Sequence, residues 1–428
     1  MSHMKKQLQL LLMLFLMLYG QLSPSMDQTA AIKAILVTYI DRTLTRAPLA
    51  TISGSYRRYK GYSSSTWSRN IASRLAEQYH LKIQTEWPIS TLGVQCVVYE
   101  IPNDRSVDDV LESLTHNKLI ESAQRMERFN VHTANLSGLE SGNTYSDVNP
   151  QFNRLPLRLT DVHQMTTGKG VLIALIDTGV DIHHPDLEDR ILSTHNLISR
   201  LSGSFNNDVH GTAVAGVIVA RANNQTGSIG IAPDARLVAF KACWPTKQGG
   251  FQATCNSLSL AMAINQAIRM DVDIINLSLS GPPDPLVERL INQALAKEII
   301  VVAADHLGDQ SEQQSFPASL DHGIAALHLT ATVDTRVSRH QKSIAVPSAN
   351  ILTTLPHGRY QRVSGCSIAT AQVTAIVALL LEVNPNLTPS EIQNLLEEAQ
   401  QDQRARGFDE IDVYALISRL RADFLTGG

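Results

Sequence analysis

Three side chains of this sequence could together cleave an acyl bond. Asp177 is the first polar residue after the apolar run GVLIALI, His210 opens the run HGTAVAGVIVA, and Ser367 lies in SGCSIATA ahead of a long apolar segment. A serine that attacks a carbonyl carbon needs a base within hydrogen-bond reach. An imidazole base in turn needs a carboxylate that fixes its tautomer and stabilises the imidazolium. One Asp, one His and one Ser, each at a predicted strand end or helix start, supply this set.

The backbone around Ser367 favours the same chemistry. The apolar segment that follows Ser367 predicts a helix, and a helix N-terminus presents a positive dipole end and a backbone N–H to a developing oxyanion. Gly365 leaves room for a substrate backbone, and Gly211 and Gly216 let a helix that begins near His210 lie close to its neighbours.

The segments between these residues alternate between two kinds of apolar pattern, which predicts an α/β fold. Short continuous apolar runs indicate buried strands, and longer runs with helical spacing separate them. Such alternation predicts a doubly wound, mostly parallel sheet with helices on both faces, whose functional groups gather at the carboxyl ends of the strands. The predicted strands are GVLIALID, RLVAFKA, DIINLSLS and IIVVAA, and the predicted helices are LSLAMAINQAI and PLVERLINQALAK.

Three segments, DTGVDIHHPDL, NNDVHGTAVAGVIVA and SGCSIATAQVTAIVALLLEVNP, resemble the signatures of the subtilisin-like serine proteases, which carry Asp, His and Ser in this chain order. The resemblance covers about residues 154–418. It implies a subtilisin-like fold and a serine endopeptidase that works through an acyl-enzyme, with Asp177, His210 and Ser367 as the catalytic triad. A protein or peptide would be the substrate.

Cys366 stands next to Ser367 and raises a second reading of the site. By the resemblance Ser367 is the nucleophile, and Cys366 occupies a position where the family commonly has threonine, so we expect it to be a packing residue. The alternative is a cysteine protease, since a thiol is a good nucleophile, but its side chain should point away from the face that Ser367 presents to His210.

The resemblance also assigns substrate contacts. The segment NLSLSG is a strand end that in the family lines the first specificity pocket and pairs with the extended peptide, a form of β-strand addition. Ser280 replaces a glycine that is usual there, which narrows the pocket. The residues predicted to bind substrate are Ser278, Leu279, Ser280 and Gly281.

One departure from the family pattern is serious. The family's oxyanion asparagine follows a strand end that here runs VVAADHLGDQ, with no asparagine. Without a gap its place falls on Leu307, and shifts of one or two residues bring His306 or Asp305 to it. Two hypotheses therefore remain open: an active endopeptidase with His306 or Asp305 as substitute donor, or a catalytically impaired homologue that acts as a binding or scaffold protein.

The N-terminal part predicts an export signal and an inhibitory domain. Residues 1–26 carry two lysines and then a short apolar stretch, which is typical of a signal peptide or, if retained, an N-terminal membrane anchor. Residues 27–132 show a small α+β pattern that resembles the family's propeptide, an intramolecular inhibitor. Residues 133–153 form a polar linker, and residues 154–428 the catalytic domain. We expect a secreted or periplasmic zymogen.

Export affects how the cysteines are interpreted. Cys243 and Cys255 flank a polar, Gly-containing insert, and in an oxidising compartment a disulfide between them is the leading prediction. Cys96 lies in an apolar run and reads as a buried strand residue. The cysteines lack zinc spacing, and the pair His183 and His184 is interpreted as a polar surface turn, so no metal is assigned to either. No cofactor is identified; no acidic loop indicates a calcium ligand, and structural calcium stays an open alternative. A net charge of -4 gives no reason to expect nucleic-acid binding.

Overall fold

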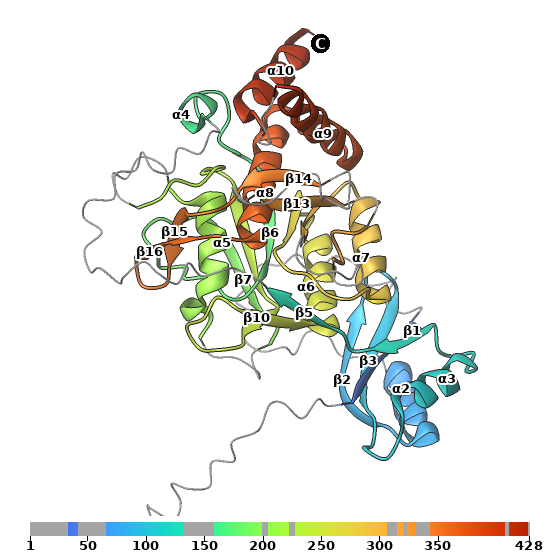
Figure 1. Cartoon of the computed structure of the whole chain (residues 1–428). Helices are drawn as coiled ribbons and strands as arrows, with labels where there is room; N and C mark the ends of the chain where they lie inside the picture. The colour runs from blue at the N-terminus through green and yellow to red at the C-terminus, as the bar shows by residue number, and fades with distance from the viewer. Residues whose placement is uncertain are drawn as a thin grey trace, which may run out of the picture.

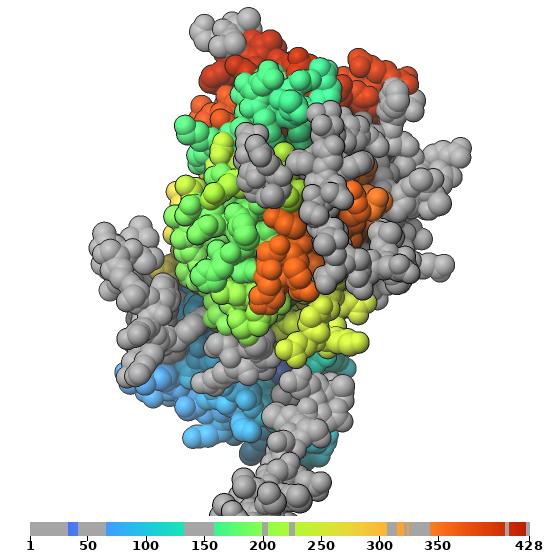
Figure 2. Space-filling view, turned by 90° about the vertical axis from the view of Figure 1, so that its left-hand side faces the viewer, coloured from blue at the N-terminus to red at the C-terminus, as the bar shows by residue number. Residues whose placement is uncertain are grey.

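The computed structural model describes residues 33–41, 66–131, 158–198, 204–221, 227–305, 315–320, 323–329, 343–406 and 411–426. It has two parts, a small α+β domain drawn in blue and a larger α/β domain drawn from green to red (Figure 1). The small domain lies against one end of the large one, and helices near the C-terminus lie at the opposite end (Figure 2). The predicted segments 1–26 and 133–153 lie outside the described residues.

The small domain is an antiparallel sheet covered by two helices. Its strand order is β2-β3-β1-β4, and all three pairings are antiparallel. A fifth strand leaves this sheet and joins the large domain. The elements are β1 (Ala34–Ile40), α2 (Thr66–Tyr79), β2 (Lys82–Ile89), β3 (Val94–Glu100), α3 (Val107–Thr115), β4 (Ser122–Arg125) and β5 (Arg128–Val131).

The large domain is built on a seven-stranded sheet in the order β14-β13-β12-β11-β6-β8-β7. Every pairing among the described strands of this sheet is parallel, which confirms the predicted doubly wound α/β class. The strands are β6 (Leu172–Asp177), β7 (Ile191–Asn196), β8 (Arg236–Lys241), β11 (Ile274–Leu277), β12 (Ile300–Asp305), β13 (Ile324–Leu329) and β14 (Ile344–Pro347). Two hairpins lie beside it, β9 (Cys243–Pro245) with β10 (Ala253–Asn256), and β15 (Ile351–Leu355) with β16 (Arg359–Val363).

Helices cover both faces of the sheet (Figure 1). The helices are α4 (Leu159–Val162), α5 (Val209–Val219), α6 (Ser257–Arg269), α7 (Pro285–Leu295), α8 (Cys366–Val383), α9 (Pro389–Ala405) and α10 (Val413–Thr426), with a 3-10 turn at Phe205–Asn207. Helix α8 is long and apolar enough to cross a membrane by length and composition, but 83% of that window is buried inside the protein, as expected of a core helix.

Side chains that alternate between the two faces of each strand explain why the large domain has two hydrophobic clusters, one on each face of the sheet. In β6, Ile173 and Leu175 join the cluster under α5 and α8, whereas Ala174 and Ile176 join the cluster under α6 and α7. Successive side chains of a strand point to opposite faces, so a continuous apolar run must be buried on both. The second cluster continues into the small domain through Cys96 and other residues of β3, so this domain packs on the same core as α6 and α7.

Most predicted elements are present. The helix that begins at Pro389 has a capping box, in which Thr388 and Glu391 satisfy each other's backbone N–H groups. Ser106 is the N-cap residue of α3, but its side chain makes no capping hydrogen bond. Strands β1 and β5 were not predicted from the sequence. Cys96 is buried in β3, as predicted.

Candidate active site

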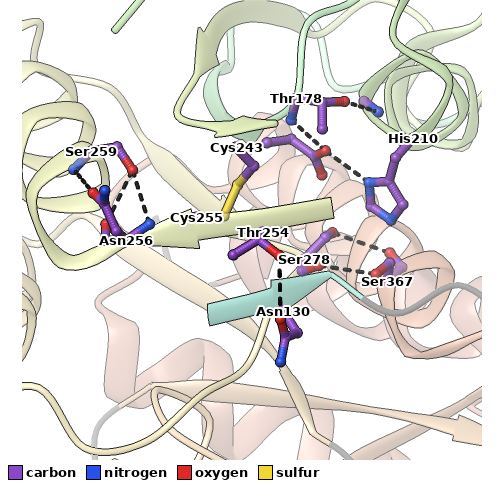
Figure 3. The surroundings of a disulfide bond; sticks show 12 residues. Asn130, Thr178, His210, Cys243, Thr254, Cys255, Asn256, Ser259, Ser278 and Ser367 are labelled. Atoms are coloured by element: carbon purple, nitrogen blue, oxygen red, sulfur yellow. Dashed lines mark hydrogen bonds and ion pairs between the residues drawn. A yellow bond between two sulfur atoms is a disulfide. The ribbon is translucent and has the colours of Figure 1, made fainter. Parts of the chain in front are cut away.

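The fold brings Asp177, His210 and Ser367 to one edge of the sheet. Asp177 is the last residue of β6, and His210 and Ser367 are each the second residue of a helix, α5 and α8. Figure 3 shows the His210 ring between the β6 end and Ser367. All three are at most 1% exposed. The strand end and the two helix starts therefore place the three predicted groups in one buried cluster.

The Asp177 carboxylate fixes the tautomer of His210. Asp177 Oδ1 lies 2.7 Å from His210 Nδ1 and also accepts the Thr178 N–H at 2.6 Å. Since a carboxylate can only accept, Nδ1 carries the proton and Nε2 keeps its lone pair. His210 Nε2 is buried and has no hydrogen-bond partner among the described residues. The imidazole is thus held ready to take a proton from a hydroxyl.

The Ser367 hydroxyl is turned toward the strand end that follows β11. It donates to the Ser278 carbonyl oxygen at 2.9 Å, and the Ser278 hydroxyl donates to the Ser367 carbonyl at 3.2 Å (Figure 3). Asn276 supports this contact by donating to Ser278 Oγ at 3.0 Å. The Ser367 hydroxyl thus donates to a backbone carbonyl, and His210 Nε2 accepts no hydrogen bond among the described residues.

Side-chain hydrogen bonds of Thr178 and Asp208 fix the first turn of α5. Thr178 Oγ1 accepts the Gly211 N–H at 2.9 Å. Asp208, the N-cap residue of α5, accepts the Gly179 N–H at 2.8 Å and an ion-paired hydrogen bond from Lys241 at the end of β8. Burial raises the pKa of Asp208, while Lys241 opposes that rise. No role was assigned to Asp208 or Lys241 from the sequence, because the two residues are 33 positions apart and no local pattern links them.

The cysteines divide as predicted. Cys243 and Cys255 form a disulfide between β9 and β10 (Figure 3). Cys366 begins α8, is partly buried and is not in a disulfide, and Gly365 precedes it with φ of 141°, in the region that favours glycine. The assignment of Ser367 as nucleophile rests on its hydrogen bonds with Ser278 and its place beside the His210 ring (Figure 3).

Strand β5 of the small domain lies between β10 and the segment that follows β11. It pairs antiparallel with β10 on one side, with Asn130 opposite Thr254. On the other side Asn130 and Ser280 exchange both backbone hydrogen bonds, at 2.8 and 3.0 Å. The predicted substrate-binding segment thus pairs with an extended strand of the chain itself, which is the β-strand addition that the sequence suggested.

A side chain of this strand fills a pocket in the large domain. Phe129 is 0% exposed, and its ring centre lies 6.1 Å from that of Phe316. Gly281 forms the wall, since a Cβ there would lie 2.7 Å from the Phe129 ring and 2.9 Å from the Arg128 carbonyl oxygen. Leu279 is also buried. The pocket accepts an aromatic side chain because residue 281 has none.

Of the two candidate oxyanion donors, Asp305 and His306, Asp305 is among the described residues. Asp305 ends β12, is 2% exposed, and its carboxylate accepts the Ser343 hydroxyl at 2.6 Å. This hydrogen bond links Asp305 Oδ2 to Ser343, the residue before β14. His306 and Leu307 lie outside the described residues, so the identity of the donor stays a prediction.

The histidine pair in DIHHPDL was predicted to lie in a surface turn, which is confirmed for the exposed His183 but is wrong for the buried His184. His184 is buried, its Nδ1 accepts the Asp186 N–H at 3.1 Å, and its Nε2 lies 3.1 Å from the Arg359 carbonyl. Because Nδ1 accepts this N–H, the ring proton lies on Nε2, and burial lowers the pKa of His184. The described residues contain no group of three or more His, Cys, Asp or Glu side chains that could hold a metal ion.

Known proteins resemble this chain in sequence and fold. Residues 168–414 match the model of the subtilase family. The intracellular serine protease of Paenibacillus polymyxa is 32% identical over 252 residues, which span 54% of this chain and 74% of that protein. The major intracellular serine protease of Bacillus subtilis is 33% identical over 225 residues, 50% of this chain and 69% of that protein.

A solved structure shows the same fold. It is the crystal structure of fervidolysin from Fervidobacterium pennivorans, described as a keratinolytic enzyme related to subtilisin. The TM-score is 0.68 at 20% identity, and the match covers 90% of this chain and 61% of that chain.

Proposed function

Because this chain belongs to the subtilase family of serine endopeptidases, we propose that it is an exported member, made as a zymogen, which hydrolyses peptide bonds through Asp177, His210 and Ser367. The observation that supports this most is the 2.7 Å contact between His210 and Asp177, which leaves Nε2 as a base beside Ser367. A scaffold protein has no physical need for three reactive groups in one buried cluster.

The proposed chemistry follows the geometry. Ser367 Oγ attacks the substrate carbonyl and transfers its proton to His210 Nε2, while Asp177 stabilises the imidazolium. His210 then gives that proton to the leaving amine, and water hydrolyses the acyl-enzyme. Ser367 stands in the first turn of α8, where backbone N–H groups point out of the helix toward a developing oxyanion.

The small domain would act as an intramolecular inhibitor. Strand β5 holds the place of a substrate between β10 and Ser280. If the antiparallel register of Asn130 and Ser280 were continued by two residues, position 132, which lies outside the described residues, would fall opposite Ser278, whose carbonyl accepts the Ser367 hydroxyl. We therefore propose that self-cleavage falls just after His132, at the peptide bond between residues 132 and 133.

Self-processing tests this proposal. The parental chain, incubated for hours, should yield a fragment whose N-terminal sequence begins at Thr133 or within the 133–153 linker, while Ser367→Ala should stay intact. A Ser367→Ala chain that is processed at the same place and rate, with host proteases excluded, would show that maturation is not autocatalytic. A parental chain that neither matures nor cleaves peptides would favour the impaired homologue.

The oxyanion donor needs its own comparison. We propose His306 before Asp305, because a histidine can donate in either protonation state, whereas a carboxyl must hold a proton to donate. Loss of one oxyanion donor typically costs about 10²- to 10³-fold in turnover. Alanine variants of both, compared on one peptide ester, should single out the donor by a loss of tens- to hundreds-fold. If both variants keep the parental rate, the Ser367 backbone N–H stabilises the oxyanion without help from either side chain.

Export is supported by the N-terminal sequence and by the disulfide, since disulfides persist in oxidising compartments. Two similar proteins are named as intracellular, so family membership does not decide the compartment. Fractionation of cells that express the full chain should find the mature enzyme outside the cytoplasm. Full-length enzyme confined to the cytoplasm would contradict export without touching the catalytic proposal.

A further inference from the structure

The ion pair of Asp208 and Lys241 lies beside the triad but is not part of it. Lys241 is the last residue of β8 and pairs in register with Asp177 at the end of β6. Its side chain is 0% exposed, and lysine is almost never fully buried unless it is paired. A buried charge is costly, so its presence at the edge that carries the catalytic aspartate calls for a function.

The Asp208 carboxylate joins three elements at one atom. Oδ2 accepts from Lys241 Nζ of β8 and from the Gly179 N–H, 2.8 Å away, in the turn that follows β6. Asp208 is also the N-cap of α5, and its carbonyl accepts the Thr212 hydroxyl at 2.6 Å. A Cβ at residue 179 would lie 2.7 Å from Oδ2, so glycine is what lets the carboxylate approach.

We propose that the Asp208–Lys241 ion pair is a positioning element of the catalytic site, which fixes the first turn of α5 so that His210 meets Asp177. His210 follows Asp208 by two residues in the same turn, so a shift of the N-cap moves the imidazole directly. Lys241 fixes that N-cap relative to β8, the strand that is paired with the strand of Asp177. The inference rests on the proposed function, because it concerns the same reaction.

The pair also sets the charge around the imidazole. Two carboxylates, Asp177 and Asp208, lie near each other at this edge, and Lys241 supplies a cation. Asp181 is a further carboxylate in the turn that contacts α5: its N–H donates to Thr212 Oγ1, and its oxygens accept backbone N–H groups of His183 and His357. From β15, the neutral hydroxyls of Thr353 and Thr354 donate to the Ala213 and Thr212 carbonyl oxygens of α5.

Asp208→Asn tests the proposal because it keeps the shape and an acceptor for Gly179 but removes the charge. We expect kcat to fall about 10- to 100-fold with KM within about twofold, since small misplacements of a catalytic group can cost about 100-fold. Loss of the Asp208 negative charge leaves the Lys241 positive charge less compensated and should disfavour the imidazolium, so the acidic limb of the pH profile of kcat/KM should move to lower pH. Parental kcat and an unmoved limb in folded protein would overturn the proposal, as would a loss carried by KM alone.

A double variant, Asp208→Asn with Lys241→Met, covers the case in which the single variant does not fold. Because it removes both charges of the ion pair, the double variant should fold, and its acidic limb should return to the parental pH. Its kcat should stay about 10-fold lowered, because the contact between β8 and α5 is gone. Parental kcat in the folded double variant would overturn the proposal.

A matched control removes an ion pair elsewhere on the same sheet. Arg190→Met breaks the 3.4 Å pair with Asp234, which precedes β8 and so lies at the opposite strand end from Lys241. It should leave kcat, KM and the acidic limb unchanged, and a matching loss there would overturn the proposal. Fluorophosphonate titration separates the two ideas: an unlabelled parental chain overturns the proposed function, whereas a labelled parent with unaffected variants overturns this inference alone.

Discussion

Phe129→Ala should open the cleft of the unprocessed chain. Phe129 is fully buried in the pocket formed by Gly281 and Phe316, although it belongs to the small domain. The substitution leaves the backbone of β5 able to pair with β10 and Ser280, so it removes the side-chain anchor and little else. If the small domain is an inhibitor, the cleft must become accessible more often.

The size of the effect follows from the area that is buried. A buried phenylalanine removes about 150 Å² or more of surface from water, which at about 25 cal/mol per Å² is roughly 3–4 kcal/mol. Phe→Ala substitutions at buried sites cost about 3–5 kcal/mol. Since about 1.4 kcal/mol is a factor of ten, a loss of about 3 kcal/mol shifts the equilibrium between the occupied and the open cleft by roughly 100-fold.

The assay is the rate at which a fluorophosphonate probe labels the full-length band. Phe129→Ala should be labelled about 100-fold faster than the parental chain, and Phe129→Leu much less so, because it keeps most of the apolar volume. Trp67→Ala is the matched control, an aromatic truncation in the same domain at a side chain that is 50% exposed and packs on Tyr39. Equal labelling rates for Phe129→Ala and Trp67→Ala would refute the idea that β5 blocks the cleft.

Three other outcomes follow from the same structure. Gly211→Ala should lower both activity and thermal stability, because its Cβ would lie 2.6 Å from the Gly179 carbonyl oxygen and push α5 away; unchanged kcat and melting temperature would contradict this. Replacing Cys243 and Cys255 by serine should cost on the order of 3 kcal/mol in denaturant unfolding, and a loss below about 0.5 kcal/mol would contradict that account. Burial lowers the pKa of His184 in the folded state, so the unfolded chain binds the proton more readily and the unfolding free energy should fall as pH drops below about 6.5; denaturant melts between pH 5 and 7.5 should show a smaller fall in His184→Gln.

The sequence predicted the triad because each member stands at a local boundary. Asp177 ends an apolar run, and His210 and Ser367 begin runs of small and apolar residues, so strand ends and helix starts can be read within a few residues. Parallel strands then bring their carboxyl ends to one edge, which is why order and flanking residues were enough to predict the site.

Features that depend on contacts between residues far apart in the sequence could not be predicted from the sequence. Strand β5 has four residues, and its stabilisation comes from β10 and Ser280, more than 100 residues away in sequence. The ion pair of Lys241 with Asp208 was not predicted, because nothing in the local sequence shows that these two side chains meet. Tertiary contacts of this kind override local propensity.

The identity of the nucleophile tests the central claim most directly. The mature enzyme should be treated with a fluorophosphonate, digested and mapped by mass spectrometry, beside the variants Ser367→Ala and Cys366→Ala. We predict one adduct on Ser367, no adduct in Ser367→Ala, and an adduct at the parental rate in Cys366→Ala, with peptide hydrolysis lost in the first variant only. Hydrolysis that survives Ser367→Ala, or that disappears with Cys366→Ala in folded protein, would contradict the Asp177–His210–Ser367 mechanism.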